Sequence, residues 1–114
     1  MKPFLVIASV LILLYSCGPA IHTNLISSYS TLNYNTAVQV FELNEDAPDG
    51  SIVVGYCEIS DSGFSINCNY FTVLQKAKEE ARKFGSNAIK ITEHKTPNLI
   101  SSCHRIKVTL LKTN

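Results

Sequence analysis

Residues 70–89 read YFTVLQKAKEEARKFGSNAI, and this stretch decides the fold. Its apolar side chains recur at steps of four, three, four and three residues, which places them along one face of a helix from about Tyr70 to Phe84. That face consists of Tyr70, Leu74, Ala77, Ala81 and Phe84. The opposite side is charged, and the two alanines allow the helix to lie close against a sheet.

Two patterns of residues suit the start of this helix. Asn69 can cap it directly, or Thr72 with Gln75 can form a capping box one turn later. Gly85 suits the position after the helix, because glycine readily adopts the left-handed conformation that ends helices. The helix therefore has a defined end and two candidate starts.

Strand patterns precede the helix. Residues 37–43 read AVQVFEL and residues 51–60 read SIVVGYCEIS, and the turn-forming sequence NEDAPDG at 44–50 separates them. Because side chains alternate along a strand, one face of the second strand carries Val53, Gly55, Cys57 and Ile59. We expect this face to pack against the helix.

Two further strand patterns follow the helix. Residues 88–92 read AIKIT, residues 96–98 (TPN) turn the chain, and residues 103–112 alternate again. In this last strand one face consists of Ile106, Val108 and Leu110. The two strands are therefore expected to contribute to the same core.

The order of the predicted elements is ββαββ. A strand, a helix and a strand in succession favour a right-handed crossover between parallel strands, and short connections favour antiparallel hairpins for the first and the last pair. We therefore predict an α+β domain in which a single helix packs on a four-stranded mixed sheet.

This topology leads to a prediction about the cysteines. Cys68 lies between the second strand and the helix, and Cys103 opens the fourth strand. Because the second and third strands are parallel, both end where the fourth strand begins, so Cys68 and Cys103 should meet in a disulfide. Cys57 lies ~10 Å further into the second strand and is expected to be a buried thiol. The alternative is that Cys57 replaces one of the two partners.

The first seventeen residues indicate export. Lys2 precedes an apolar run from Phe4 to Leu14, which is too short to span ~30 Å of hydrocarbon and is typical of a secretory signal peptide. The segment Leu14-Tyr15-Ser16-Cys17 resembles the lipobox of bacterial lipoproteins, in which the cysteine is acylated and the chain is cleaved just before it. Tyr15 stands where the pattern usually has Ala, Ser or Thr, and the alternatives are ordinary secretion and an uncleaved membrane anchor.

Cleavage before Cys17 would divide the chain into a signal peptide at 1–16, a lipidated cysteine with a flexible tether at 17–35, and a folded domain at 36–114. The tether is predicted because residues 18–35 show no clear hydrophobic period. Loss of Lys2 leaves equal numbers of basic and acidic residues, so we expect no nucleic-acid partner. A domain of this size often needs covalent support, which a disulfide supplies in an oxidising compartment.

Three segments carry a resemblance to a known family: residues 57–60 (CEIS) with Cys68, residues 81–89 (ARKFGSNAI), and residues 103–105 (CHR). Over roughly residues 50–110 the chain resembles the periplasmic domain of RcsF-type outer-membrane lipoproteins, which sense envelope stress, and small lipoproteins of Bacteroidota with an RcsF-like domain. The resemblance implies the same pairing of Cys68 with Cys103 and an interaction module without catalytic residues. The second disulfide and the long Pro-rich, basic tether of RcsF have no counterpart here.

Two histidines suggest a metal site. His94 and His104 end and begin neighbouring strands, and with Cys68 or Cys103 they could bind zinc through nitrogen and sulfur. Against this, their spacing matches no standard metal motif, and a disulfide would consume the thiolates. We therefore predict two surface histidines beside a structural disulfide, with no metal and no cofactor.

Patterns that suggest catalysis are weaker. Glu58 and Asp61 form a pair of carboxylates, but one lies on a solvent-facing strand position and the other in a turn. In residues 101–104 (SSCH), neighbouring strand residues point to opposite faces, so the thiol and the imidazole of this segment are not expected to hydrogen bond. No Cys-x-x-Cys pair is present for redox chemistry. We therefore predict that the protein is not an enzyme.

The leading hypothesis is a cell-envelope lipoprotein anchored through Cys17, whose disulfide-bonded domain binds another envelope protein in a sensing or scaffolding role. Residues 18–20 (GPA) lack the acidic run that resembles a surface-export signal in Bacteroidota, so we expect the outer membrane, facing the periplasm. The alternative is a periplasmic metal or small-ligand binding protein that uses His94, His104 and free cysteines.

Overall fold

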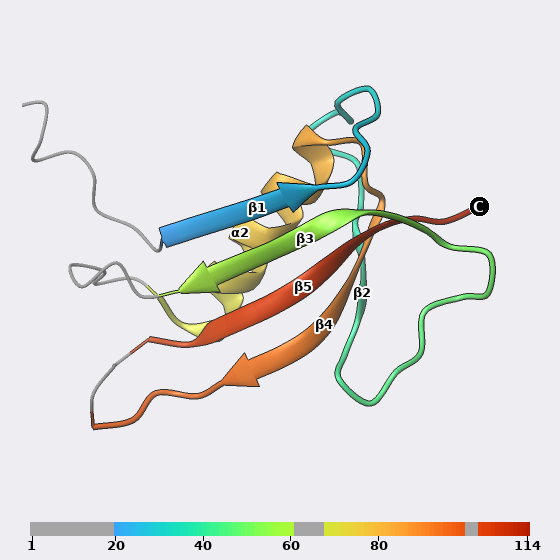
Figure 1. Ribbon diagram of the computed structural model, residues 1–114. Coiled ribbons are helices and arrows are strands. Elements are labelled where there is room, and N and C mark those ends of the chain that lie inside the picture. The colour runs from blue at the N-terminus through green and yellow to red at the C-terminus, as the bar shows by residue number, and fades with distance from the viewer. Residues whose placement is uncertain (1–19, 61–67, 100–102) are drawn as a thin grey trace, which may run out of the picture.

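The computed structural model describes residues 20–60, 68–99 and 103–114 (Figure 1). In chain order the elements are β1 (Ala20–Leu25), β2 (Gln39–Phe41), β3 (Ile52–Ser60), α2 (Tyr70–Lys83), β4 (Ala88–Lys95) and β5 (Arg105–Lys112). Over these residues α2 lies on one face of a five-stranded mixed sheet with the strand order β1-β3-β5-β4-β2. The predicted class, α+β with one helix on a mixed sheet, is therefore confirmed, whereas the predicted number of four strands is wrong.

The helix begins at the first of its two candidate starts, with Asn69 as the cap. The Asn69 side-chain oxygen accepts a hydrogen bond from the Thr72 backbone N–H at 2.8 Å, so the cap and not the later capping box starts the helix. Val73, Ala77 and Ala81 are fully buried. Tyr70, Leu74 and Phe84 flank them and are partly buried. The predicted stripe is therefore correct apart from Val73, which lies at its centre and was missed.

The second half of the sheet follows the prediction. β4 and β5 form an antiparallel hairpin, and β5 also pairs antiparallel with β3. β3 and β4 are consequently parallel, as expected, but β5 lies between them. Both strands end on the side of the sheet where β5 begins (Figure 1), which is the geometry on which the cysteine prediction depends.

The predicted hairpin between the first two strands is wrong. The strand expected at 37–43 is reduced to β2, which runs parallel to β4 with Gln39 opposite Ala88 and Phe41 opposite Lys90. The physical reason is that β1 and β5 already occupy both edges of β3, so β2 can hydrogen bond only at the free edge of β4.

The predicted tether is also corrected, because the described chain is already part of the sheet at Ala20. β1 pairs antiparallel with β3, from Ala20 opposite Ser60 to Leu25 opposite Gly55. The sequence shows no clear strand period here because an edge strand buries little apolar surface: Ile21 and Leu25 are still 37% and 42% exposed. The hydroxyl of Thr23, on this strand, donates to a carboxylate oxygen of Glu80 on α2 at 2.8 Å.

The segment after β1 lies against the end of the helix. The Tyr29 backbone N–H donates to the Phe84 carbonyl at 3.0 Å, and the Leu32 N–H donates to the Arg82 carbonyl at 2.8 Å. Gly85 makes this approach possible, because its φ of 78° is left-handed and a Cβ there would lie 2.5 Å from the Tyr29 Cβ. The described fold therefore includes residues 20–35, which were predicted to be part of the tether.

The core lies between α2 and the sheet. Cys57 and Ile59 of β3 and all three predicted residues of β5 are buried in it. A register shift between Val53 and Gly55 turns Val54 into the core in place of the predicted Val53. Within the described residues no helix has the length and apolar character needed to cross a membrane.

Candidate functional site

The predicted disulfide forms at the end of the sheet where β3 and β4 finish. Cys68 and Cys103 are bonded, with their Cα atoms 5.0 Å apart, and the backbone N–H of His104 donates to the Cys68 carbonyl at 3.1 Å. Cys57 is not a partner; it is a free, buried thiol. The bridge therefore joins the residue before the cap of α2 to the start of β5, as the topology predicted.

Beside the disulfide, two histidines form a direct contact. His94 lies near the end of β4 and His104 immediately precedes β5, and the Nε2 atom of His94 lies 2.9 Å from the Nδ1 atom of His104. A hydrogen bond at this distance needs one nitrogen to donate and the other to accept, so the pair requires at least one neutral acceptor nitrogen. The β4–β5 hairpin thus brings together the two histidines that the sequence placed on neighbouring strands.

Tyr70, the first residue of α2, covers this pair. Its ring stacks on His94 with centroids 4.6 Å apart and lies 5.9 Å from the ring of His104. The Tyr70 hydroxyl donates to the Glu42 carboxylate at 3.0–3.1 Å. We refer to Glu42, Tyr70, His94 and His104 as the His–Tyr cluster.

Glu42 reaches the cluster because the chain after β2 is held in place by β4. The ammonium group of Lys90 donates to the backbone carbonyls of Glu42, Leu43 and Glu45. No pattern in the sequence links Glu42 to the histidines, and Tyr70 appears in the sequence only as part of an apolar stripe. These two members of the cluster were therefore missed.

Two side chains of the His–Tyr cluster, His94 and Tyr70, have pKa values that are shifted toward their uncharged forms. Burial lowers the pKa of His94, the neighbouring His104 lowers it further, and the Glu42 charge opposes them. Burial, the hydrogen bond to Glu42 and the charge of that carboxylate raise the pKa of Tyr70 to about 12. Tyr70 is thus a hydrogen-bond donor at neutral pH, and protonation of His94 is disfavoured by folding.

The lowered pKa of His94 predicts a loss of stability in mild acid. In the unfolded chain a histidine titrates near 6.5, so below this pH the unfolded state binds more protons than the folded state. We expect the free energy of unfolding to fall as the pH drops from about 7 to about 5, and to fall less in His94→Gln. Urea unfolding at each pH measures this, with His22→Gln on the exposed β1 as the control. An unchanged pH slope in His94→Gln would contradict the prediction.

The other candidate groups are separated from this cluster. Burial raises the pKa of the Cys57 thiol to about 11, against the lowering effect of a contact with the Thr23 hydroxyl. Glu58 is exposed on β3, as predicted. Cys17, Asp61 and the pair Ser101-Ser102 lie outside the described residues. Among the residues that are described, no three or more His, Cys, Asp or Glu side chains form a group able to hold a metal ion.

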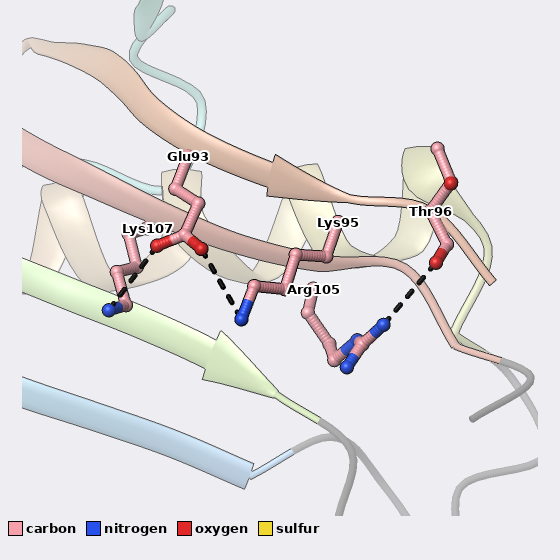
Figure 2. A network of polar contacts seen from close by, with 5 residues as sticks. All are labelled: Glu93, Lys95, Thr96, Arg105 and Lys107. Carbon is pink, nitrogen blue, oxygen red and sulfur yellow. Dashed lines mark hydrogen bonds and ion pairs between the residues drawn. The ribbon is translucent and has the colours of Figure 1, made fainter. Parts of the chain in front are cut away.

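A polar network lies on the sheet face opposite α2, near the end of the sheet where β3 and β4 finish (Figure 2). The Glu93 carboxylate contacts the ammonium groups of Lys107 at 3.3 Å and Lys95 at 3.4 Å, and these contacts, that of Lys107 first, lower the pKa of Glu93. Arg105 donates to the Thr96 carbonyl at 3.3 Å. A hollow of about 220 Å³ is lined by these charged residues of β4 and β5 together with the end of β3.

Comparison of the chain with protein-family models, with curated proteins and with solved structures finds no match.

Proposed function

We propose that the protein is a cell-envelope lipoprotein whose small domain is a non-catalytic interaction or stress-sensing module, facing the periplasm from the outer membrane. The observation that carries the proposal is the apolar run of residues 4–14 followed by Leu14-Tyr15-Ser16-Cys17. The disulfide between Cys68 and Cys103 supports it, because such bonds persist in oxidising compartments such as the periplasm.

The cysteines and the Tyr70 hydroxyl are in states that support binding over chemistry. Cys68 and Cys103 are bonded to each other, and with a pKa of about 11 the Cys57 thiol stays protonated at neutral pH. Tyr70 also stays protonated, with a pKa of about 12. A nucleophile or base needs a pKa near the working pH, so these groups suit packing and hydrogen bonding rather than catalysis.

The second candidate function is binding of a metal or small ligand, and the contact between His94 Nε2 and His104 Nδ1 favours it. The disulfide leaves the pair without the thiolates of Cys68 and Cys103. A thiol count on denatured, air-oxidised protein, with a zinc assay, separates the two functions. One free thiol without zinc supports the interaction module, whereas three free thiols with stoichiometric zinc support the metal carrier.

Substitution of Cys17 tests the anchor. Each acyl methylene buried in a bilayer contributes ~0.8 kcal/mol, so a cysteine with two or more acyl chains should hold the protein in a membrane permanently. We expect the wild type, purified from the native envelope, to enter the detergent phase on phase separation, and Cys17→Ser to remain in the aqueous phase. Cys57→Ser is the control and should behave as the wild type. Mass spectrometry that finds an unmodified, freely released wild-type chain would refute the proposal.

A further inference from the structure

We propose that the domain is held in one orientation on its membrane, with the anchor end of the sheet against the phosphate groups of the lipids. The anchor end is defined by Ser60, Lys95, Leu99, Arg105 and Lys107. This inference depends on the proposed lipidation of Cys17 and adds to it the surface that contacts the bilayer.

The chain between the proposed lipid and the fold is short. Only Gly18 and Pro19 separate Cys17 from Ala20, where β1 begins. Three residues span at most ~10 Å, which is far shorter than the eighteen-residue tether that the sequence suggested. A lipid at Cys17 would therefore keep the start of β1 next to the headgroups.

The sheet register determines what else lies beside Ala20. Ala20 pairs with Ser60 at the end of β3, and Lys95 at the end of β4 pairs with Arg105 at the start of β5. Neighbouring strands are ~4.8 Å apart, so β4 lies ~14 Å from β1 across the sheet. Figure 1 shows these four strand ends on one side of the domain, with the C-terminus on the other.

The anchor end carries a group of basic side chains. Lys95 and Lys107 share the carboxylate of Glu93 and keep side chains that are 59% and 52% exposed, with Arg105 beside them (Figure 2). These three cations face two carboxylates, Glu93 and the exposed Glu58. Anionic lipid surfaces attract such groups within about a Debye length.

The loop at 42–50, which leads to the start of β3 at the other end of the sheet, has the opposite character. After Glu42, which belongs to the His–Tyr cluster, it contains Glu45, Asp46 and Asp49 and no lysine or arginine. The proposed orientation therefore places the basic end on the lipid phosphates and turns most of the acidic loop away from them.

The anchor end also carries a fully exposed large apolar side chain. Leu99, in the connection from β4 to β5, is 106% exposed, which is the largest exposure of any large hydrophobic residue described. On a membrane this side chain would be removed from water at the boundary of headgroups and acyl chains. Leu43, which is 53% exposed in the acidic loop, would remain in water and provides a matched comparison.

A quenching experiment on the full lipidated protein tests the orientation. Leu99→Cys and Leu43→Cys are each labelled with a small maleimide fluorophore; Cys57 is buried with a raised pKa and does not compete. The proteins are reconstituted in vesicles of phosphatidylethanolamine and phosphatidylglycerol that contain a headgroup nitroxide lipid. We expect quenching at position 99 to exceed quenching at position 43 severalfold. Equal quenching at the two positions, or stronger quenching at 43, would overturn the orientation.

Charge reversal tests the role of the lysines. In the Leu99→Cys protein, Lys95→Glu with Lys107→Glu is expected to reduce the quenching severalfold. The control, Lys83→Glu with Lys112→Glu, makes the same change of net charge at the other end and should leave it unchanged. Undiminished quenching in Lys95→Glu with Lys107→Glu would contradict the electrostatic contact.

Flotation of the vesicles separates this inference from the function on which it depends. Protein that does not float with the vesicles refutes the lipid anchor, and the orientation with it. Protein that floats but shows no preferential quenching at position 99 keeps the anchor and refutes only the orientation.

Discussion

Replacing Cys68 and Cys103 together by alanine is expected to lower the free energy of unfolding by about 3–4 kcal/mol. The bond closes a loop with a sequence separation of 35 residues, and its loss returns that loop's conformational freedom to the unfolded chain. Because a whole domain is typically stable by only ~5–15 kcal/mol, the variant should unfold at a much lower urea concentration.

Reduction of the wild type provides an independent measurement of the same bond. Wild-type protein in dithiothreitol should unfold at nearly the same urea concentration as the double alanine variant, whose own unfolding should not respond to the reductant. Cys57→Ala is the matched control: it keeps the bond and should lose the same ~3–4 kcal/mol on reduction. A wild type whose unfolding is insensitive to reduction would show that the disulfide does not stabilise the fold.

Gly85→Ala, at the end of the helix, is expected to lower the free energy of unfolding for two reasons. The left-handed backbone at Gly85 costs a residue with a Cβ ~1–2 kcal/mol. The new Cβ would also lie 2.5 Å from the Tyr29 Cβ and 2.8 Å from the Ser30 carbonyl oxygen. Overpacking of this kind costs a further ~1–3 kcal/mol, so we expect a total loss of about 2–5 kcal/mol in urea unfolding.

Gly50→Ala separates the two causes of this loss. Gly50 has a similar φ of 82°, but a Cβ there meets nothing within 4 Å, so only the backbone cost of ~1–2 kcal/mol should appear. In Gly85→Ala, the backbone amides of Tyr29 and Leu32 should also exchange hydrogen faster, because the clash pushes their segment away from the helix end. Equal losses in the two variants would mean that residues 29 and 30 do not pack against Gly85.

The disulfide and the contact at Gly85 differ in how far the sequence alone predicts them. The disulfide could be derived before the structure was known, because α2 and the strands around it have strong hydrophobic periods and their order limits where Cys68 and Cys103 can lie. The contact at Gly85 could not be derived. Residues 26–35 are mostly exposed and polar, and the backbone hydrogen bonds that hold them to Phe84 and Arg82 do not depend on which side chains they carry.

In the candidate site, too, one contact could be predicted from the sequence and another could not. The approach of His94 to His104 follows from the β4–β5 hairpin, which the turn residues at 96–98 predict. Glu42 joins them only because β2 pairs with β4 and Lys90 holds the following turn. No local sequence pattern marks a carboxylate that is contributed by a segment distant in the chain.

The sequence by itself determined the helix and its end, the three longer strands, the buried Cys57 and the favoured partners of the disulfide, and it left Asn69 as one of two candidate caps. Each of these depends on side-chain periodicity or on the connectivity of neighbouring elements, and both can be read along the chain. Only the tertiary structure decided that β1 and β2 form the two edges of the sheet and that the fold begins within three residues of Cys17. The physical reason is that edge strands are held mainly by backbone hydrogen bonds to whichever neighbour has a free edge. The pattern of β2 therefore marks a strand but not its partner, and β1 buries too little apolar surface to show a period.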